Sequence, residues 1–281
     1  LILLKSIKVM DGWVLSFKVS NRFLNKNISV FLKKKIFMKV IAMIPARFDS
    51  ERLPGKLMMD LGGEPIILRT YKNALNSKLF DEVYVVTDSK IIFDTLKEFN
   101  AKVLMSLREH SSGSDRVAEF SSNISSDIII NIQGDEPFID ISSLSKLINL
   151  FENDIDNNID IASLMQKITI ENEISNPNIV KVVVDLNNFA IYFSRSPIPF
   201  NRSKNPKINY FKHIGVYAFR KKSLDDFYNS KPTTLEMSEK LEQLRYLEYG
   251  KKIKMIETSY RGIGIDTMED LINARKIIEC E

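Results

Sequence analysis

From Met38 onward, short apolar runs of strand length alternate with longer amphipathic stretches. The strand-like runs are KVIAMI, EVYVVT, KVLM and DIIINI. Apolar runs bounded by polar segments predict buried strands, and the segments between them predict helices over 66–77, 91–99 and 115–122. Strands that alternate with helices form a mostly parallel sheet flanked by helices, so we expect an α/β protein.

The pattern changes after residue 132. Strand-like runs cover 161–164, 180–185 and 214–219, and the proline-rich SRSPIPFNRSKNP among them predicts an exposed loop. Helices are expected to return over 238–249 and 268–278. The second half therefore predicts a mixed arrangement, within a single domain over 38–281 that has a soft boundary near residue 155.

The positive charge of the chain is concentrated at its start. Residues 1–37 hold eight basic residues and one acid, a charge of +7, which leaves +4 − 7 = −3 for the remainder. A nucleic-acid binder carries its positive charge on the folded domain, so we do not expect nucleic acid as a partner. The single cysteine, Cys280, excludes a disulfide within the chain and fits a reducing cytoplasm.

Residues 1–37 show no apolar run near the roughly 20 residues that span a bilayer, so stable membrane insertion is not expected. Lys8, Asp11 and Lys18 interrupt any signal-peptide core. One alternative is a basic amphipathic tail that lies on an anionic membrane. The preferred interpretation is a non-native or disordered basic extension, with translation starting at Met38.

The first strand-like run ends in PARFDSERLPGK, which holds Arg47, Arg52 and Lys56. Open α/β sheets bind ligands at the carboxyl ends of parallel strands. Glycine lets backbone N–H groups approach phosphate oxygens, and the basic side chains supply charge for a polyphosphate. The order of residues is not that of a Walker loop, and a solvated basic loop is the plainer alternative.

HSSGSDR, residues 110–116, follows the third strand-like run. Small hydroxyl and glycine residues at a helix start can both cap the helix and admit a nucleotide. Capping alone explains neither His110 nor Arg116.

DIIINIQGDEP is an apolar run that delivers Gln133, Asp135 and Glu136 to its end. Magnesium prefers one or two carboxylates plus phosphate oxygens, at about 2.0 to 2.1 Å, so this strand end is a candidate cation site. GIGIDTMEDL supplies a second acid, Asp266, after another strand-like run, although such a residue alone is more often a helix cap.

These segments, in this order, resemble the 3-deoxy-manno-octulosonate cytidylyltransferases, or CMP-Kdo synthetases, over 38–278. Further similar blocks are NPNIVKVV, YFSRSPIP, HIGVYAF, LEMSEKLEQLRYLEYG and GIDTMEDL. Sister enzymes that activate sialic acids resemble the first half but lack the combination of YFSR, HIGVYAF and LEQLR. The second half therefore points to the sugar, 3-deoxy-D-manno-octulosonate (Kdo).

The resemblance implies a Rossmann-like nucleotidyltransferase fold, with a mixed, mostly parallel sheet flanked by helices and a smaller sugar-binding and dimerisation part. Residues 38–155 would bind CTP and 156–281 the sugar. The implied reaction transfers CMP from CTP to the anomeric hydroxyl of Kdo, releasing pyrophosphate. The implied setting is a Mg²⁺-dependent cytoplasmic homodimer in lipopolysaccharide biosynthesis.

The resemblance also assigns residues to roles. The catalytic set is Arg47, Lys56, Asp135 and Asp266, of which Asp135 and Asp266 hold Mg²⁺. The residues around the nucleotide are Ala46, Arg47, Lys56, Ser112, Gly113 and Arg116. The sugar-binding residues are Gln133, Arg195, His213, Tyr217, Glu242 and Gln243. Without the resemblance, Tyr217 is better explained as core and Glu242 as helix surface.

Two positions depart from the family pattern: Phe48 stands where tyrosine is usual, and residues 199–201 replace a usual Pro-Trp-Asp. The second departure bears on loop closure or dimer contacts. Two alternative functions stay open, namely the same chemistry on 8-amino-Kdo or a sialic acid, and an inactive nucleotide-sugar sensor. The sensor would require a lost lysine or aspartate, and neither is lost.

Overall fold

The computed structural model describes residues 13–14, 33–34, 38–50, 52–108, 113–121, 123–138, 140–203, 208–260 and 264–279. The chain divides into two compact units, 1–38 and 39–281. In the first unit, β1 (Trp13–Val14) pairs antiparallel with β2 (Lys33–Lys34). The expected extension over 1–37 otherwise lies outside the described residues.

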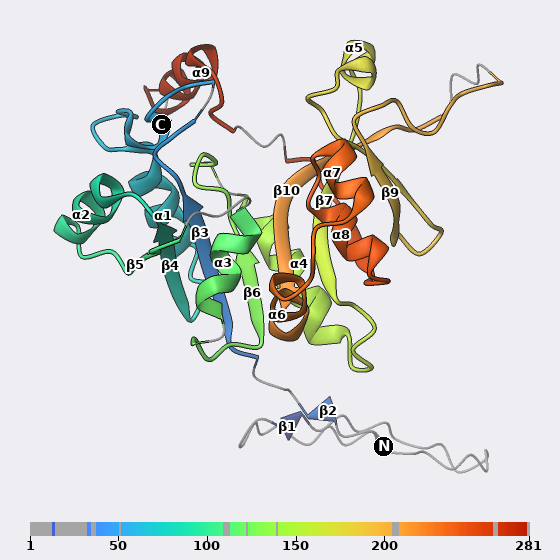
Figure 1. Cartoon of the computed structure of the whole chain (residues 1–281), viewed down its shortest axis with the longest axis horizontal. Helices are drawn as coiled ribbons and strands as arrows, with labels where there is room; N and C mark the ends of the chain where they lie inside the picture. Colours follow the sequence, from blue (N-terminus) through green and yellow to red (C-terminus); the bar gives the residue numbers. More distant parts are fainter. Residues whose placement is uncertain are drawn as a thin grey trace, which may run out of the picture. The chain divides into compact units, whose positions relative to one another are not determined.

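The second unit is built on one mixed sheet (Figure 1). Its strand order is β11-β7-β10-β6-β3-β4-β5, and β8 joins by pairing with β10 and β9. The strands are β3 (Val40–Ala46), β4 (Glu82–Thr87), β5 (Val103–Met105), β6 (Ile128–Asn131), β7 (Ile161–Lys167), β8 (Lys181–Val184), β9 (Ala190–Ser194), β10 (Phe211–Arg220) and β11 (Ile253–Glu257). Strands β6, β3, β4 and β5 run parallel, whereas β10 is antiparallel to its neighbours. The predicted mixed α/β sheet is confirmed.

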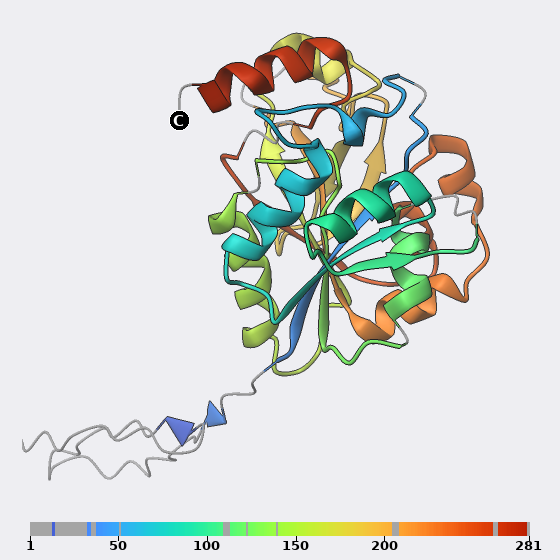
Figure 2. The same ribbon diagram turned by 90° about the vertical axis from the view of Figure 1, so that its left-hand side faces the viewer.

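Helices cover both faces of this sheet. The helices of the described residues are η1 (Lys56–Met58), α1 (Ile66–Asn76), α2 (Lys90–Glu98), α3 (Gly113–Ser121), α4 (Ile141–Asn153), α5 (Glu171–Ser175), α6 (Lys221–Tyr228), α7 (Thr234–Glu239), α8 (Gln243–Glu248) and α9 (Met268–Glu279). Helices α1 and α4 lie on one face, and α3 and α6 on the other (Figure 2). Within the described segments, none of these helices is long and apolar enough to cross a membrane.

The central strands are buried on both faces, which explains their continuous apolar sequence. Every position of β3 and β6 is buried, and Ile41, Met43 and Ile129 are fully enclosed. Removing a methylene-sized group from such a core costs stability because the neighbouring helices cannot close the gap completely. The strand ends are therefore held firmly, and the loops that follow them start from fixed points.

Strand β10 joins the two halves of the chain into one sheet. It lies between β6 and β7, with Tyr217 opposite Asn131. Because β10 runs antiparallel to β6, its first residues lie beside the carboxyl end of β6. His213 and Gln133, far apart in sequence, are thereby brought to the same edge of the sheet.

Two sequence predictions are wrong in detail. The helix expected over 238–249 is broken into α7 and α8, because Lys240 adopts a left-handed conformation at φ 54° that ends α7. The strand-like run before Asp266 forms no strand in its described part, residues 264 and 265. Pattern reasoning also missed β9, β11, α4, α5 and α6.

Candidate active site

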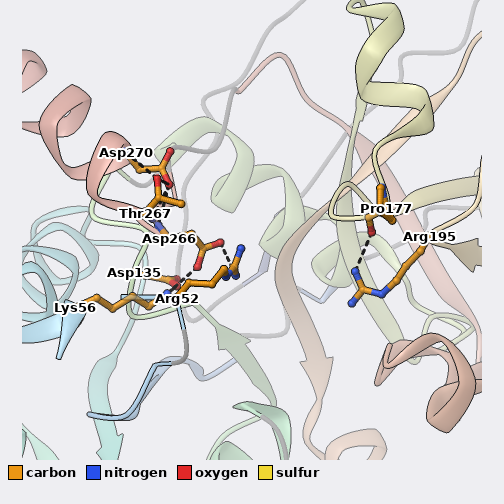
Figure 3. A network of polar contacts seen from close by, with 8 residues as sticks. All are labelled: Arg52, Lys56, Asp135, Pro177, Arg195, Asp266, Thr267 and Asp270. Atoms are coloured by element: carbon orange, nitrogen blue, oxygen red, sulfur yellow. Dashed lines mark hydrogen bonds and ion pairs between the residues drawn. The ribbon is translucent and has the colours of Figure 1, made fainter. Parts of the chain in front are cut away.

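Lys56 lies at the centre of a charged cluster beyond the carboxyl ends of β3 and β6 (Figure 3). Its ammonium donates a short hydrogen bond to Asp135 and another to Asp266 Oδ1 at 2.9 Å. Gly55 precedes it at φ +66°, a left-handed conformation that glycine adopts without strain. That turn starts η1 and directs Lys56 inward, where the residue is only 8% exposed.

Asp135 reaches the cluster because the backbone before it packs tightly against β3. A Cβ atom on Gly134 would lie 2.9 Å from the carbonyl oxygen of Pro45. The Thr70 hydroxyl donates to the Gly134 carbonyl at 2.9 Å, and the Ile265 amide donates to the Asp135 carbonyl at 2.9 Å. The loop after β6 is thus fixed from two sides.

Asp266 is positioned by the first turn of α9. The Asp270 carboxylate accepts from the backbone amides of Asp266 at 3.1 Å and Thr267 at 2.8 Å. This leaves the Asp266 side chain free to face Lys56, and Arg52 forms an ion pair with it at 2.9 Å. The carboxylates of Asp135 and Asp266 therefore converge on the ammonium of Lys56.

The cluster alters the acidity of its members. Burial alone would lower the pKa of Lys56, but the two carboxylates outweigh it and raise that pKa above its ordinary value. Burial, followed by the charges of Asp135 and Asp266, raises the pKa of neighbouring Glu136 to about 7. Negative charge is thus concentrated here, and a bound cation would relieve it.

The two aspartates fit a magnesium ion. Both offer hard oxygen ligands, and the Lys56 ammonium that lies between them shows that one cation can contact both. Within the described residues, no group of three or more His, Cys, Asp or Glu side chains is arranged around a metal position. Water and phosphate oxygens would complete the coordination, which is the usual arrangement for magnesium with nucleotides.

Those predicted nucleotide residues that the structure describes lie at the same edge of the sheet. Ala46 ends β3, and Gly113 begins α3 beside it, where a Cβ would lie 3.2 Å from Pro45 Cγ. Arg116 is buried at 5% exposure, ion-paired with Asp88, and its Nε has no partner among the described residues. Arg47 is exposed. Ser112 lies outside the described residues.

Four of the predicted sugar residues are hydrogen-bonded in two groups, a chain of three hydrogen bonds and a single pair. Gln133 donates to Asn131 Oδ1 at 3.4 Å, Asn131 donates to Ser114 at 3.4 Å, and Ser114 donates to Glu242 at 2.8 Å. In the pair, the Tyr217 hydroxyl donates to Gln243 Oε1 at 3.2 Å. Tyr217 is a core residue at 4% exposure, so the plainer explanation for it also holds, but its hydroxyl is directed to a polar partner.

His213 lies in a row of aromatic rings on β9 and β10. Its ring centroid is 5.1 Å from Phe193, in edge contact, and 5.2 Å from Tyr217. Burial lowers the pKa of His213 to about 3, so the imidazole is neutral at neutral pH. Burial and the charge of Glu242 raise the pKa of Tyr217, which keeps its phenol protonated.

The Arg195 guanidinium forms no hydrogen bond with the other predicted sugar residues that the structure describes. The guanidinium donates to the backbone carbonyl of Pro177 at 3.0 Å (Figure 3). It also donates to the carbonyls of Glu239 at 2.7 Å and Lys240 at 3.4 Å. In this arrangement Arg195 ties the end of α7 to the loop before β8. Two of its five N–H groups are left over, because each of the three carbonyls takes one.

Sequence reasoning missed several polar residues that lie inside strands, at a helix start or, in the case of Asp88, in the loop after β4. Asn131 and Ser114 connect the first hydrogen-bond chain, Asp88 orients Arg116, and Ser163 contacts His213. Lys181 is fully buried, with its ammonium on the carbonyls of Asn176, Ile179 and Arg195. The available signal was a polar residue inside an apolar run, because such residues are rarely buried without a partner.

The fold and this cluster define an α/β protein in which a lysine and two aspartates meet at the carboxyl edge of parallel strands, the edge where open α/β sheets bind ligands. A family model described as cytidylyltransferase matches residues 41–253. The chain is 58% identical, over 86% of its length and 99% of the relative, to a protein of Flavobacterium johnsoniae named 3-deoxy-manno-octulosonate cytidylyltransferase. The chain belongs to the cytidylyltransferase family and, within it, to the 3-deoxy-manno-octulosonate cytidylyltransferases.

Two further comparisons agree. A Christiangramia forsetii protein with the same name is 53% identical, covering 85% of this chain and 97% of the relative. A solved structure described as CMP:2-keto-3-deoxy-manno-octonic acid synthetase complexed with CTP superposes with a TM-score of 0.81. It is 37% identical and covers 86% of this chain and 99% of its own.

Proposed function

We propose that this protein transfers CMP from CTP to the anomeric hydroxyl of Kdo, giving CMP-Kdo and pyrophosphate. The observation that carries the proposal is the placement of Lys56 between Asp135 and Asp266 at the carboxyl edge of the parallel strands. A basic group and two carboxylates at one point suit a triphosphate with its cation. Membership of the 3-deoxy-manno-octulosonate cytidylyltransferases supports Kdo as the sugar.

In the proposed reaction the anomeric oxygen of Kdo attacks the α-phosphorus of CTP, and pyrophosphate leaves in line. No covalent enzyme intermediate is required, so the protein acts through positioning and charge. Lys56 and exposed Arg47 hold the triphosphate and stabilise the leaving pyrophosphate. Asp135 and Asp266 would hold Mg²⁺, which when bound lowers the pKa of the attacking hydroxyl and neutralises phosphate charge.

Ala46, Ser112, Gly113 and Arg116 are proposed to surround the nucleotide. Gly113 at the start of α3 packs closely on Pro45, where a Cβ would lie 3.2 Å from Pro45 Cγ, and Arg116 is held by Asp88. Arginine is the side chain best suited to a rigid, multi-donor contact.

Gln133, His213, Tyr217, Glu242 and Gln243 are proposed to bind the hydroxyl groups of Kdo. They are amide, imidazole, phenol and carboxylate groups, which together can donate to and accept from a polyhydroxylated ring.

Arg195 is proposed to bind the sugar carboxylate with its two remaining N–H groups. The guanidinium is already fixed by three carbonyls, so little side-chain entropy would be lost when the sugar binds.

We further propose that the protein is a homodimer in the cytoplasm, and that its product enters lipopolysaccharide biosynthesis. Leu186, Ile191 and Phe200 on the β8–β9 hairpin and the loop after it are 104%, 61% and 85% exposed. A contact with a second copy of the chain would remove these exposed apolar side chains from water. Size-exclusion chromatography coupled to light scattering measures the mass of the protein in solution. A monomer at micromolar concentration would contradict the proposed dimer.

The activity is tested by pyrophosphate release from the full chain with CTP, Mg²⁺ and one of three sugars: Kdo, 8-amino-Kdo or a sialic acid. Release with Kdo is the expected outcome. Release only with another sugar would keep the mechanism and change the substrate. No release from protein with a folded circular dichroism spectrum would support the nucleotide-sugar sensor instead.

A further inference from the structure

Ser163, in the middle of β7, is fully buried directly beside His213. Its hydroxyl oxygen lies 2.9 Å from His213 Nε2, 2.8 Å from the Val216 carbonyl oxygen and 3.2 Å from the Ile214 carbonyl oxygen. The two carbonyls reach the same hydroxyl because the pairing of β10 with β7 shifts register between Ile214 and Tyr217. A regular antiparallel ladder would direct them to the backbone of β7 instead.

The contacts of Ser163 decide which atom carries each proton. A hydroxyl has one proton to donate and two lone pairs that accept. If Ser163 donated to His213, its lone pairs would face two carbonyl oxygens, an arrangement of acceptors against acceptors in a buried place. The proton therefore goes to a carbonyl, of which Val216 is the nearer, and a lone pair accepts an N–H from His213.

We propose that Ser163 is a positioning residue that holds His213 with its proton on Nε2, so that the Nδ1 lone pair accepts a hydrogen bond from a hydroxyl of the acid sugar. The ligand in this inference rests on the function proposed above. The tautomer itself does not, because it follows from the contacts of Ser163.

The surroundings of His213 support this assignment. Nδ1 forms no hydrogen bond with any described residue, whereas Nε2 is engaged by Ser163. The rings of Phe193 and Tyr217, at 5.1 and 5.2 Å, restrict rotation of the imidazole that would exchange its two nitrogens. Burial also disfavours the doubly protonated ring, whose Nδ1–H would have no acceptor among the described residues.

The assignment has a chemical consequence for recognition. An unprotonated Nδ1 accepts from an O–H group but repels a carboxylate, which has only acceptors. His213 would therefore bind a hydroxyl of the sugar and leave the carboxylate to another group. Ser163 would contribute to sugar selection without touching the sugar.

The tautomer can be measured directly in the full chain. The sequence has two histidines, so ¹⁵N-histidine labelling gives two sets of ring signals, and the His213→Gln variant assigns them. We expect wild-type His213 to show a protonated Nε2 and an unprotonated Nδ1 near neutral pH. A protonated Nδ1 in the wild-type protein would overturn the proposal, whatever the activity of any variant.

The kinetic test compares two variants of Ser163. Ser163→Ala removes the acceptor, so we expect mixed tautomers and a KM for Kdo raised roughly threefold to tenfold, the range expected for one hydrogen bond. The KM for CTP should stay unchanged. Ser163→Thr keeps the hydroxyl and should restore both the single tautomer and the KM for Kdo.

Ser223→Ala is the matched control. Ser223 lies on α6, is also buried, and donates a hydrogen bond to the Asp160 side chain at 3.2 Å. Equal KM values for Kdo in Ser163→Ala and Ser223→Ala would overturn the positioning role. If wild-type protein released no pyrophosphate with Kdo, the proposed function would fail, while the nitrogen spectrum would still decide the tautomer.

Discussion

Lys56 and Asp266, 210 positions apart in the sequence, meet at 2.9 Å. The lysine follows the first strand of the sheet, and the aspartate precedes the last helix of the chain. Their meeting requires the complete fold, because Asp266 is held by the turn that starts α9 and by the backbone contact of Ile265 with Asp135. The charged cluster is therefore assembled only when the fold is complete.

Replacing Asp135 with asparagine should abolish most activity and spare the fold. The variant loses a charged oxygen ligand for the cation, so we expect turnover to fall on the order of 100-fold or more. Initial rates of pyrophosphate release at saturating Mg²⁺ provide the measurement, with thermal unfolding as the check on folding. Asp49→Asn, at an exposed position of the neighbouring loop, should behave like wild type. Near-normal turnover of Asp135→Asn would contradict the metal assignment.

Replacing Lys56 with methionine should have opposite effects on cation binding and on turnover. The ammonium lies where a metal ion would contact both carboxylates, so its removal should tighten Mn²⁺ binding in the absence of CTP. Turnover should nevertheless fall, because the triphosphate loses a positive partner. Titration followed by electron paramagnetic resonance measures the first effect, and weaker Mn²⁺ binding in the variant would show that the ion binds elsewhere.

Replacing Arg195 with lysine should raise the KM for Kdo more than the KM for CTP. Lysine cannot reproduce the flat, multi-donor contact with a carboxylate. It also leaves carbonyls of Glu239, Pro177 or Lys240 without a donor, so we expect a stability loss of about 1 to 3 kcal/mol. Steady-state kinetics in both substrates and urea unfolding measure the two effects. Equal changes in both KM values would argue against the carboxylate contact.

The sequence pattern predicted correctly the strands that are buried on both faces of the sheet. The run from Ile128 to Ile130 is buried on both faces, so its purely apolar sequence marks it as part of a central strand. It failed where a single backbone torsion decides the outcome. The sequence from 238 to 249 is amphipathic throughout, and nothing local indicates that Lys240 takes a left-handed conformation and splits the helix.

The site shows the same division. Asp135 could be predicted because parallel strands place their following residues at a common edge, and its position after an apolar strand is visible in the sequence. Ser163 could not be assigned a role, because its hydroxyl is meaningful only beside His213 and the bulge in β10. Arg195 was predicted as a ligand residue, yet its backbone contacts depend on the end of α7, which the sequence pattern did not locate.

The buried imidazole of His213 should make the protein less stable in mild acid. Its pKa is about 3 in the folded state against 6.5 for an ordinary histidine, so between these values the unfolded chain binds a proton that the folded chain does not. Stability is therefore fully present above pH 6.5 and falls as the pH decreases, by up to about 1.4 kcal/mol per pH unit. Urea unfolding between pH 7 and 5 should show a shallower dependence for His213→Asn. Parallel curves would contradict the shift.

Gly134 should tolerate no side chain, although it lies in a conformation that other residues can adopt. A Cβ at this position would lie 2.9 Å from the Pro45 carbonyl and 3.1 Å from Ile67 Cδ1, so the loop after β6 would have to move away from β3. We expect Gly134→Ala to lose about 1 to 3 kcal/mol of stability through overpacking.

The same displacement would move Asp135 away from Lys56, so activity should fall further than the stability loss explains. Gly215→Ala is the matched control for stability, because a Cβ there meets no atom within 4 Å. The free energy of unfolding and the turnover of both variants test this prediction. A Gly134→Ala protein as stable as Gly215→Ala would show that the loop after β6 has room to shift, and the close packing of Gly134 on Pro45 would then not be what fixes Asp135.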